Sequence, residues 1–349
     1  MGLESKNNYT IPVAVAVSGG ADSLMALYLL AREKRACAAL HARFVQDQNP
    51  ALEKSLQEIC SRLQVPLHVL DLRQEFEQLI IRPFVQTYLQ GETPNPCAWC
   101  NTRIKFGLLL QKARELGAGC LASGHYVRQT AKGLLQRGLD STKEQSYFLA
   151  LLDSEQTAGA CFPLGCWHKE QVRIRLRQEG LHVPVSEESQ EICFVPDRDY
   201  RSFLFRQGVH LPGPGPIADT GGRVLGRHQG LYCYTIGQRK GLGIAYREPL
   251  YVLGKNMQDN MLVVGPAQEL RSRGFMLREP NFVLPGEKWP QEIWVQTNYR
   301  EQAVPAVVEK GSREWYVRFL QERKPATPGQ VAAFYCAHGR ILGGGIIHG

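Results

Sequence analysis

Apolar runs alternate with amphipathic patterns along roughly the first 200 residues of the chain. Four short apolar runs have the composition of buried strands, at residues 11–17, 37–44, 66–72 and 119–125. Three stretches space their apolar residues three or four apart, as amphipathic helices do, at residues 23–34, 51–63 and 102–117. Strands that alternate with helices predict an α/β domain with a parallel sheet. The ligands of such sheets bind beyond the carboxyl ends of the strands.

The pattern changes after about residue 205, where glycine, proline and short β-type runs dominate. These runs lie at residues 208–222, 231–238 and 251–256. From about residue 272, strand-like segments recur between turn signals about 8 to 12 residues apart, at residues 292–299, 303–310, 314–320 and 330–336. This spacing fits a small antiparallel barrel. We therefore expect three domains, at residues 1–205, 206–271 and 272–349.

The composition is that of a globular protein. Of 349 residues, 44% are hydrophobic and 21% are charged, with no repeat or low-complexity tract. No apolar run approaches the roughly 20 residues of a membrane-spanning helix, and the first residues lack the apolar core of a secretory signal. We expect a cytoplasmic protein without a membrane partner. The net charge of +8 favours an anionic partner without identifying it.

The segment SGGADS, residues 18–23, stands where the first strand passes into the first helix. Backbone amides of such a turn and helix start can bind a phosphate, and the two glycines permit its close approach. The hydroxyls of Ser18 and Ser23 would add donors, and Asp22 would help to hold Mg2+. The segment is not a Walker A sequence. Its plain alternative is a glycine-rich turn with an N-cap serine.

The chain has ten cysteines, and in a reducing cytosol most of them should be small buried hydrophobes. Cys97 and Cys100 form a CxxC pair, which fits zinc ligands, a thioredoxin-type switch or a catalytic thiol. Cys161 and Cys166 would complete a four-cysteine zinc site with them. Taken alone, Cys193 is interpreted as a buried structural cysteine.

SGGADS resembles the signature of the PP-loop ATP pyrophosphatases, which cleave ATP between the α and β phosphates and transfer AMP to a carbonyl oxygen. Together with six further blocks, it makes the chain resemble the tRNA-specific 2-thiouridylases over nearly its whole length. The blocks are TPNPCAWCNTRIKF (93–106), ASGHYVR (122–128), KEQSYFL (143–149), SQEICFV (189–195), GLYCYTIGQRKGLGIA (230–245), and PGQVAAFY with LGGGII (328–347). The resemblance implies a PP-loop catalytic domain like that of the adenine nucleotide hydrolases, then a small mostly-β tRNA-binding domain and a C-terminal β-barrel. It further implies a tRNA-uridine 2-sulfurtransferase that converts the wobble uridine to 2-thiouridine.

This reaction needs an activated oxygen and two cysteines. A uridine 2-carbonyl oxygen is a poor leaving group, so ATP would first adenylate it, with release of pyrophosphate. A cysteine persulfide would then supply sulfur, and a second cysteine would free the terminal sulfur by forming a disulfide with the first. By resemblance, Cys193 carries the persulfide and Cys100 is its partner. We expect Cys100 to precede a helix that begins near Thr102. The N-terminus of that helix, with Arg103 and Lys105 nearby, would favour the thiolate.

At Cys97 the chain departs from one branch of the family, whose members have aspartate there, so an acid–base carboxylate is missing. Cys97 would then donate a proton or shape the pocket of the base. A further interpretation makes Cys97, Cys100 and Cys193 the ligands of a 4Fe-4S cluster with one open iron for sulfide.

The resemblance also implies residues that contact ATP, Mg2+ and tRNA. The ATP-binding residues are Ala16, Val17, Ser18, Gly19, Gly20, Ala21, Asp22, Ser23, Ala42 and Gly124. The tRNA-binding residues are Asn95, Pro96, Cys97, Lys143, Glu144, Gln145, Arg239, Lys240, Tyr299 and Arg300. Basic residues with a stackable ring suit the phosphates and unstacked bases of an anticodon stem-loop. A cysteine desulfurase or sulfur-relay protein would be the sulfur donor.

Each of these positions has an ordinary interpretation when it is taken alone. Residues 143–145 would be an exposed helix start, His125 a strand-end histidine with a satisfied hydrogen bond, and Arg239 with Lys240 solvated surface. Two other functions also stay open. An ATP-dependent amide ligase of the same loop family would not need the two cysteines, and a non-catalytic tRNA-binding protein would not need an intact SGGADS. ATP-to-AMP turnover that depends on tRNA separates these functions from sulfur transfer.

Overall fold

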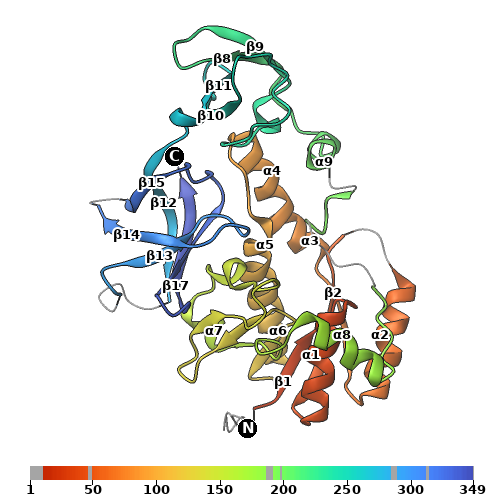
Figure 1. Cartoon of the computed structure of the whole chain (residues 1–349). Helices are drawn as coiled ribbons and strands as arrows, with labels where there is room; N and C mark the ends of the chain where they lie inside the picture. The colour runs from red at the N-terminus through yellow and green to blue at the C-terminus, as the bar shows by residue number, and fades with distance from the viewer. Residues whose placement is uncertain are drawn as a thin grey trace. The chain divides into compact units, whose positions relative to one another are not determined.

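The computed structural model describes residues 11–45, 49–185, 192–196, 199–283, 289–311 and 314–348, and Figure 1 traces the chain. The chain folds into two compact units that each collect segments from distant parts of the sequence. The first unit contains Met1–Ile80, Cys97–Gln190 and His338–Ile341, and the second contains Ile81–Pro96, Glu191–Ala337 and Leu342–Gly349. In the described part of the chain, no helix is long and apolar enough to cross a membrane.

A parallel sheet forms the centre of the first unit, as the alternating pattern predicts. Its strands follow the order β3-β2-β1-β4-β7. They are β1 (Val13–Ala16), β2 (Ala36–Arg43), β3 (Leu67–Asp71), β4 (Cys120–Ala122) and β7 (Ala160–Cys161). From β1 the chain adds β2 and β3 on one side and then returns to add β4 and β7 on the other. The order therefore reverses between β1 and β4, and ligands of such sheets bind at this point.

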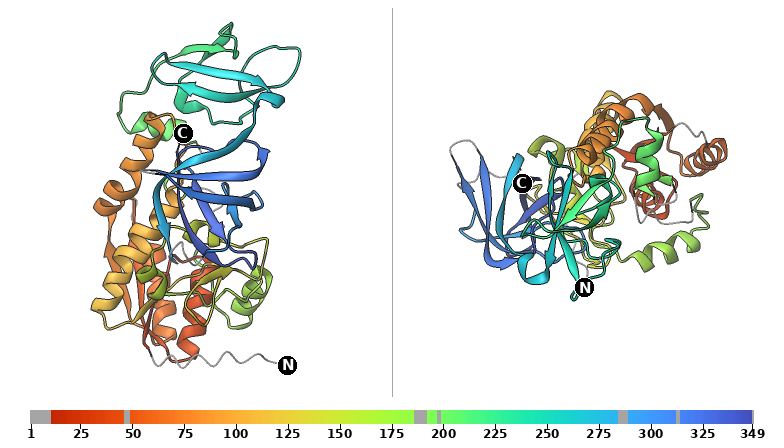
Figure 2. Two further views of the ribbon diagram at one scale, coloured as in Figure 1. Left: turned by 90° about the vertical axis from the view of Figure 1, so that its left-hand side faces the viewer. Right: turned by 90° about the horizontal axis from the view of Figure 1, so that it is seen from above.

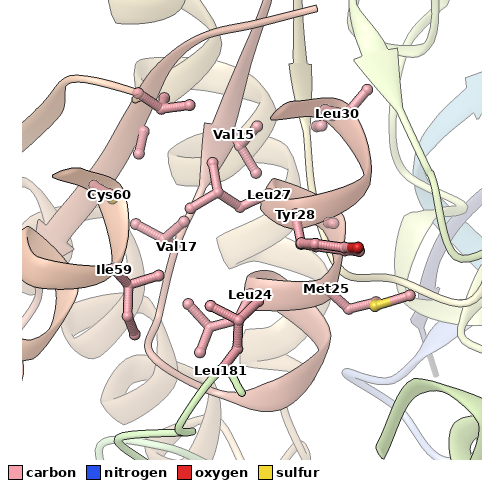
Figure 3. Close-up of a cluster of buried hydrophobic side chains, with 14 of the residues drawn as sticks. Val15, Val17, Leu24, Met25, Leu27, Tyr28, Leu30, Ile59, Cys60 and Leu181 are labelled. Atoms are coloured by element: carbon pink, nitrogen blue, oxygen red, sulfur yellow. The ribbon is translucent and has the colours of Figure 1, made fainter. Parts of the chain in front are cut away.

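Helices connect these strands and pack on the sheet. The α-helices of this unit are α1 (Ala21–Arg32), α2 (Pro50–Arg62), α3 (Arg73–Phe76), α5 (Pro96–Trp99), α6 (Leu110–Glu115), α7 (Ser154–Ala158) and α8 (Lys169–Gln178), whereas α4 (Arg82–Leu89) belongs to the second unit. They are joined by the π-helical stretches η1 (Glu77–Ile81) and η2 (Cys100–Leu109), the 3-10 turn η3 (Ser146–Leu149) and a hairpin of β5 (Val127–Gln129) and β6 (Leu135–Arg137). Val15 of β1 and Leu24 and Leu27 of α1 are completely buried in the core that Figure 3 shows. Burial of this apolar face holds α1, and the loop before it, against the sheet.

The second unit begins its β structure with a four-stranded sheet of order β10-β11-β8-β9. Its elements are α9 (Tyr200–Arg206), β8 (Gly215–Ala218), β9 (Val224–His228), η5 (Leu231–Cys233), β10 (Leu250–Asn256), β11 (Met261–Pro266) and η6 (Ala267–Glu269). The β-type run expected at residues 231–238 is wrong, because residues 231–233 form a 3-10 turn and no strand follows before β10. Leu231, Cys233 and Tyr234 are buried in the core beside this sheet. Their apolar character therefore reflects packing and not strand pairing.

A closed barrel of six strands ends the chain, and Figure 2 shows it from two further sides. The order around the barrel is β12-β15-β14-β13-β16-β17. The strands are β12 (Ser272–Phe282), β13 (Ile293–Gln296), β14 (Val304–Lys310), β15 (Trp315–Arg323), β16 (Val331–Tyr335) and β17 (Ile341–His348). The expected barrel and overall fold class are thus confirmed. The pattern had missed β12 and the glycine-rich β17, in which Gly345 has no room for a side chain beside Leu277.

Candidate active site

The loop of residues 18–23 joins β1 to α1 and is braced by its own serines. Ser23 Oγ donates to the carbonyl oxygen of Gly20 at 2.9 Å and accepts the amide of Ser18 at 3.1 Å. Gly20 is the N-cap of α1 and makes no side-chain cap bond, so the N-cap serine of the alternative interpretation is wrong. Ser23 is 7% exposed. Its hydroxyl thus holds the loop, whereas the first amides of α1 have no intrahelical acceptor.

Two glycines in this region have no room for a side chain. Gly19 has a φ of +86°, and a Cβ there would lie 2.5 Å from Leu52 Cδ1. Gly124 follows β4, and a Cβ on it would lie 2.6 to 2.8 Å from atoms of Asp22 and Ser23. The turn after β4 therefore packs directly on the first turn of α1. This contact lies at the point where the strand order reverses, and glycine permits it because it has no side chain.

Asp22 makes an ion pair that the sequence does not reveal. Lys169 Nζ donates to its two carboxylate oxygens at 2.7 and 2.8 Å, and the Tyr126 hydroxyl donates to one of them at 2.7 Å. The side chain of Lys169 is 9% exposed and that of Asp22 is 33% exposed. An ammonium group and the amides of a helix N-terminus are both groups that bind anions, and a phosphate site here stays a prediction. The same ammonium is paired with the Asp22 carboxylate, which was expected to hold Mg2+.

Lys169 is the residue of this site that our sequence analysis missed. It is the first residue of α8, and its own amide donates to Asp140 Oδ2 at 3.0 Å. A cation at the N-terminus of a helix is opposed by the helix dipole. A lysine at the start of an expected helix was therefore the available signal in the sequence. It indicates that the charge of Lys169 is stabilised by a partner elsewhere in the fold.

The other residues expected around ATP lie on the same edge of the sheet. Ala16 ends β1 and is paired with Leu40, so Ala42 lies two residues further along β2 at its carboxyl end. The carbonyl oxygen of Val17 accepts a hydrogen bond from Nδ1 of buried His41 at 2.9 Å. These strand ends, the loop of residues 18–23 and Gly124 are brought together as the sequence predicts. A contact of each with ATP stays a prediction.

The turn after β4 contains a hydrogen bond of its own, as the ordinary interpretation of His125 expects. Ser123 Oγ and His125 Nδ1 are 2.8 Å apart. Burial and the nearby charge of Lys105 lower the pKa of His125 well below its usual value. Burial thus favours the neutral form of the His125 ring, whose centroid lies 6.4 Å from that of Phe106 and 6.2 Å from that of Phe162.

The helix that carries the cysteine pair begins earlier than expected. It starts at Pro96, so Cys97 lies in its first turn and Cys100 lies inside it, as the first residue of the π-helical stretch η2. The expectation that Cys100 precedes a helix beginning near Thr102 is therefore wrong. Arg103 donates to the carbonyl oxygen of Leu79 at 3.0 Å and lies over the ring of Trp99. π-Helical stretches often lie at functional sites because they displace side chains from the regular helical spacing.

Cys193 is exposed, so its interpretation as a buried structural cysteine is wrong. Its neighbour Phe194 is 6% exposed and packs edge-on against Phe84 of α4 and Phe203 of α9, with ring centroids 5.2 and 5.4 Å apart. This aromatic anchor fixes the short segment and leaves the preceding thiol at the surface. Residues 189–191 of the SQEICFV block lie outside the described residues.

Among the described residues, no three or more His, Cys, Asp or Glu side chains are grouped so that they could hold a metal ion. The four-cysteine zinc site of Cys97, Cys100, Cys161 and Cys166 is therefore not formed among these residues. Cys161 instead lies beside Cys120 of the neighbouring strand β4, and this thiol is the main cause that raises the pKa of Cys161.

The triplet of residues 143–145 is not an exposed helix start. Glu144 is 9% exposed and pairs with Arg137 at 2.9 Å, while Gln145 accepts the backbone amide of Tyr126 at 3.2 Å. Both side chains brace the segment after β4. Lys143 is half-buried in the same turn. A role of this triplet in tRNA binding stays a prediction.

The remaining residues expected to bind tRNA differ in their exposure. Arg239 and Lys240 are exposed in a turn of the second unit. Tyr299 is 36% exposed and, with exposed Arg300, follows strand β13 of the barrel. Asn95 and Pro96 are buried where the helix of Cys97 begins. The four exposed side chains are accessible, whereas Asn95 and Pro96 are buried. Contact of any of these residues with tRNA stays a prediction.

Three family models match consecutive parts of the chain. They are described as a tRNA methyl transferase HUP domain over residues 11–197, a tRNA methyl transferase PRC-barrel domain over 202–266 and an aminomethyltransferase beta-barrel domain over 272–347. The tRNA-specific 2-thiouridylase MnmA of Nitratidesulfovibrio vulgaris is 49% identical over 341 residues, which cover 97% of this chain and 99% of that protein. The protein of the same name from Lawsonia intracellularis is 48% identical and covers 96% of this chain and 98% of its own. A solved NH3-dependent NAD synthetase from Campylobacter jejuni is similar over 50% of this chain and 67% of its own, at 20% identity and a TM-score of 0.32.

Proposed function

Because this chain belongs to the family of the tRNA-specific 2-thiouridylases, we propose that it is a tRNA-uridine 2-sulfurtransferase. It would use ATP to activate the 2-carbonyl oxygen of the wobble uridine and then replace that oxygen with sulfur. The observation that supports activation by ATP is the position of the Lys169 ammonium. It lies beside the first turn of α1, where the strand order reverses. The names of the relatives that match over nearly their full length support tRNA as the substrate.

In the first step, the uridine oxygen attacks the α-phosphorus of ATP and pyrophosphate leaves. Negative charge grows on the departing phosphates, and preformed positive groups stabilise it without reorganisation. The amides of the first turn of α1 and the ammonium of Lys169 have the charge and position for this role. Bound Mg2+ would neutralise phosphate charge, and Asp22 is the carboxylate suited to it. Lys169 would then exchange the carboxylate of Asp22 for a phosphate oxygen.

In the second step, sulfur replaces the adenylated oxygen. The exposed thiol of Cys193 suits an exchange with a donor protein, which would leave a persulfide on it. The terminal sulfur attacks carbon 2 of the uridine, and AMP leaves with the original oxygen. The Cys100 thiolate then attacks Cys193 Sγ, so that the sulfur–sulfur bond breaks, the sulfur stays on the base and a Cys100–Cys193 disulfide forms. A reductant must reopen this disulfide before the next turnover.

The division of labour along the chain belongs to the same proposal. Residues 1–205 would carry the chemistry, and residues 206–271 and 272–349 would bind the anticodon stem-loop. The separate family matches to residues 11–197, 202–266 and 272–347 support this division. The exposed side chains of Arg239, Lys240, Tyr299 and Arg300 support an RNA-binding role of the later parts. The sulfur donor would be a cysteine desulfurase or a sulfur-relay protein.

The test is pyrophosphate release measured with and without tRNA, in the wild type and in Asp22→Asn. We expect release that requires tRNA, and its loss in the variant with tRNA affinity within a few fold, because Asp22 acts on ATP and not on the anticodon. Turnover that requires a small carboxylate instead would support an amide ligase. Binding of tRNA without ATP turnover would support a binding protein, and methylation of tRNA without pyrophosphate release would support the reaction in the family-model descriptions.

A further inference from the structure

The turn that leads into the cysteine pair is bound by the C-terminal barrel. This turn, residues 91–94, ends three residues before Cys97. Gln330 Nε2 donates to the carbonyl oxygens of Thr93 and Pro94, both at 2.9 Å. The amide of Thr93 donates to the carbonyl oxygen of Pro328 at 2.8 Å. Three hydrogen bonds thus tie the turn to the loop before β16.

The glycine between Pro328 and Gln330 makes this approach possible. Gly329 has a φ of +88°, and a Cβ on it would lie 2.8 Å from the Thr93 carbonyl oxygen and 2.9 Å from its amide nitrogen. A side chain would therefore push the two backbones apart. The family-like block that begins at Pro328 is thus explained by its contact with the turn, because only glycine fits there.

Further residues of the second unit hold the same turn. Glu92, whose side chain is 13% exposed, pairs with Arg278 of β12 at 2.5 Å and lies 3.3 Å from His348 Nδ1. Lys255 Nζ of β10 donates to the carbonyl oxygen of Gly91 at 2.7 Å. The four-stranded sheet and the barrel therefore both make polar contacts with residues that precede the cysteines.

A short, stiff segment of chain connects this turn to the cysteines. Pro94 and Pro96 have restricted backbone angles, and the residue before each proline is restricted too. Pro96 is the last residue that belongs to the second unit, and Cys97 is the first that returns to the other unit. The helix of Cys97 and Cys100 starts at Pro96 itself. A displacement of the turn is therefore passed to both thiols.

We propose that Gln330 is a positioning residue for sulfur transfer, which holds the 91–94 turn so that Cys97 and Cys100 are placed for reaction. The barrel then takes part in the chemistry and does not serve RNA binding alone. This inference rests on the proposed function for its catalytic consequence. Sulfur exchange needs the attacking and leaving sulfur atoms in line, and small misplacements of reacting groups cost large factors in rate.

The test compares Gln330→Met with Gln321→Met, which makes the same change at an exposed position of β15 in the same barrel. Methionine keeps the length of glutamine but cannot donate to the two carbonyl oxygens. The first readout is the rate of alkylation of each cysteine by iodoacetamide, resolved by mass spectrometry, with exposed Cys166 as internal reference. The second is single-turnover thiolation of tRNA, measured beside the dissociation constant for tRNA.

We expect Gln330→Met to change the alkylation of Cys97 or Cys100 at least about threefold relative to Cys166, and to slow thiolation roughly tenfold. Binding of tRNA and the unfolding temperature should stay close to those of Gln321→Met. Arg278→Met, which removes the ion pair to Glu92, should change the same thiols if Gln330→Met folds poorly. Unchanged alkylation and thiolation in either folded variant would overturn the inference. If the wild type makes no thiouridine, the proposed function fails, and the alkylation rates still decide the positioning role.

Discussion

Replacing Lys169 by methionine removes the ammonium from Asp22 and keeps a side chain of similar length. In the wild type, Lys169 Nζ bonds both carboxylate oxygens of Asp22. The variant leaves this carboxylate the hydroxyl of Tyr126 and the water that reaches its exposed third. We therefore expect two effects, a loss of stability and a loss of tRNA-dependent pyrophosphate release.

The size of the stability loss follows from the burial of the pair. An exposed ion pair contributes about 0 to 1 kcal/mol, and removing one partner of a fully buried pair costs about 3 to 5 kcal/mol. Lys169 is nearly buried at 9% exposure, but Asp22 is 33% exposed. The variant should therefore lose about 2 kcal/mol of unfolding free energy. For a unit of this size, the unfolding temperature should fall by roughly 4 to 8 °C.

Urea unfolding of the full chain measures this loss in a double-mutant cycle of Lys169→Met and Asp22→Asn. Midpoint shifts, converted with the wild-type slope, should give a coupling free energy of about 1 kcal/mol or more. Lys112→Met is the matched control. Its pair with Glu115 is exposed at 40% and 51%, so it should cost less than about 0.5 kcal/mol.

Two results would refute this reasoning. A coupling free energy within about 0.3 kcal/mol of zero, with Lys169→Met as stable as Lys112→Met, would show that the pair does not hold α8 to the loop. Undiminished pyrophosphate release by folded Lys169→Met would show that the ammonium does not act on the phosphates.

Three further predictions concern the thiols and the half-buried Lys255. Cys193→Ser should block formation of a protein-bound persulfide, whereas Cys100→Ser should retain the persulfide and yield no thiouridine; labelled sulfur found on Cys100 would reverse these roles. Protein purified without oxygen should contain less than about one iron per chain, where a 4Fe-4S centre needs four, and Cys97→Ala should slow thiolation without stopping it; an obligatory cluster lost in this variant would make Cys97 a ligand. Burial lowers the pKa of Lys255 to about 8 from 10.5, so between these values the unfolded chain holds a proton that the folded chain has lost, and stability should rise with pH. Lys255→Met should abolish this rise in urea midpoints at pH 7 and 9.5, and parallel pH dependences of variant and wild type would contradict the assignment.

The sequence by itself determined the order of elements and the place of the phosphate loop. The buried strands of a parallel sheet appear as continuous apolar runs, because helices cover both faces. Segments 11–17 and 37–44 therefore predicted β1 and β2 correctly, and the apolar run at 66–72 predicted β3, although this edge strand is only partly buried. Alternation and turn signals predicted most strands of the barrel in the same way, since they record which residues face a core.

Apolar composition alone could not separate burial from strand pairing. Residues 231–238 carry a strand-like composition, yet they pack beside the sheet without joining it. In the opposite direction, Cys193 was expected to be buried but is exposed, because its neighbour Phe194 supplies the anchor to the core. The start of the cysteine helix was misplaced because Pro96 suits the first turn of a helix as well as a loop.

Only the tertiary structure decided which distant groups meet. Lys169 reaches Asp22 across 147 residues of chain, and Gln330 reaches Thr93 across 237. No local period or cap signal encodes such a pair, because its formation depends on the order of the strands and on the packing of helices and barrel around them. The charge on Lys169 and the amide of Gln330 can be read from the sequence. Their partners come within hydrogen-bond distance only when the sheet and the barrel have formed.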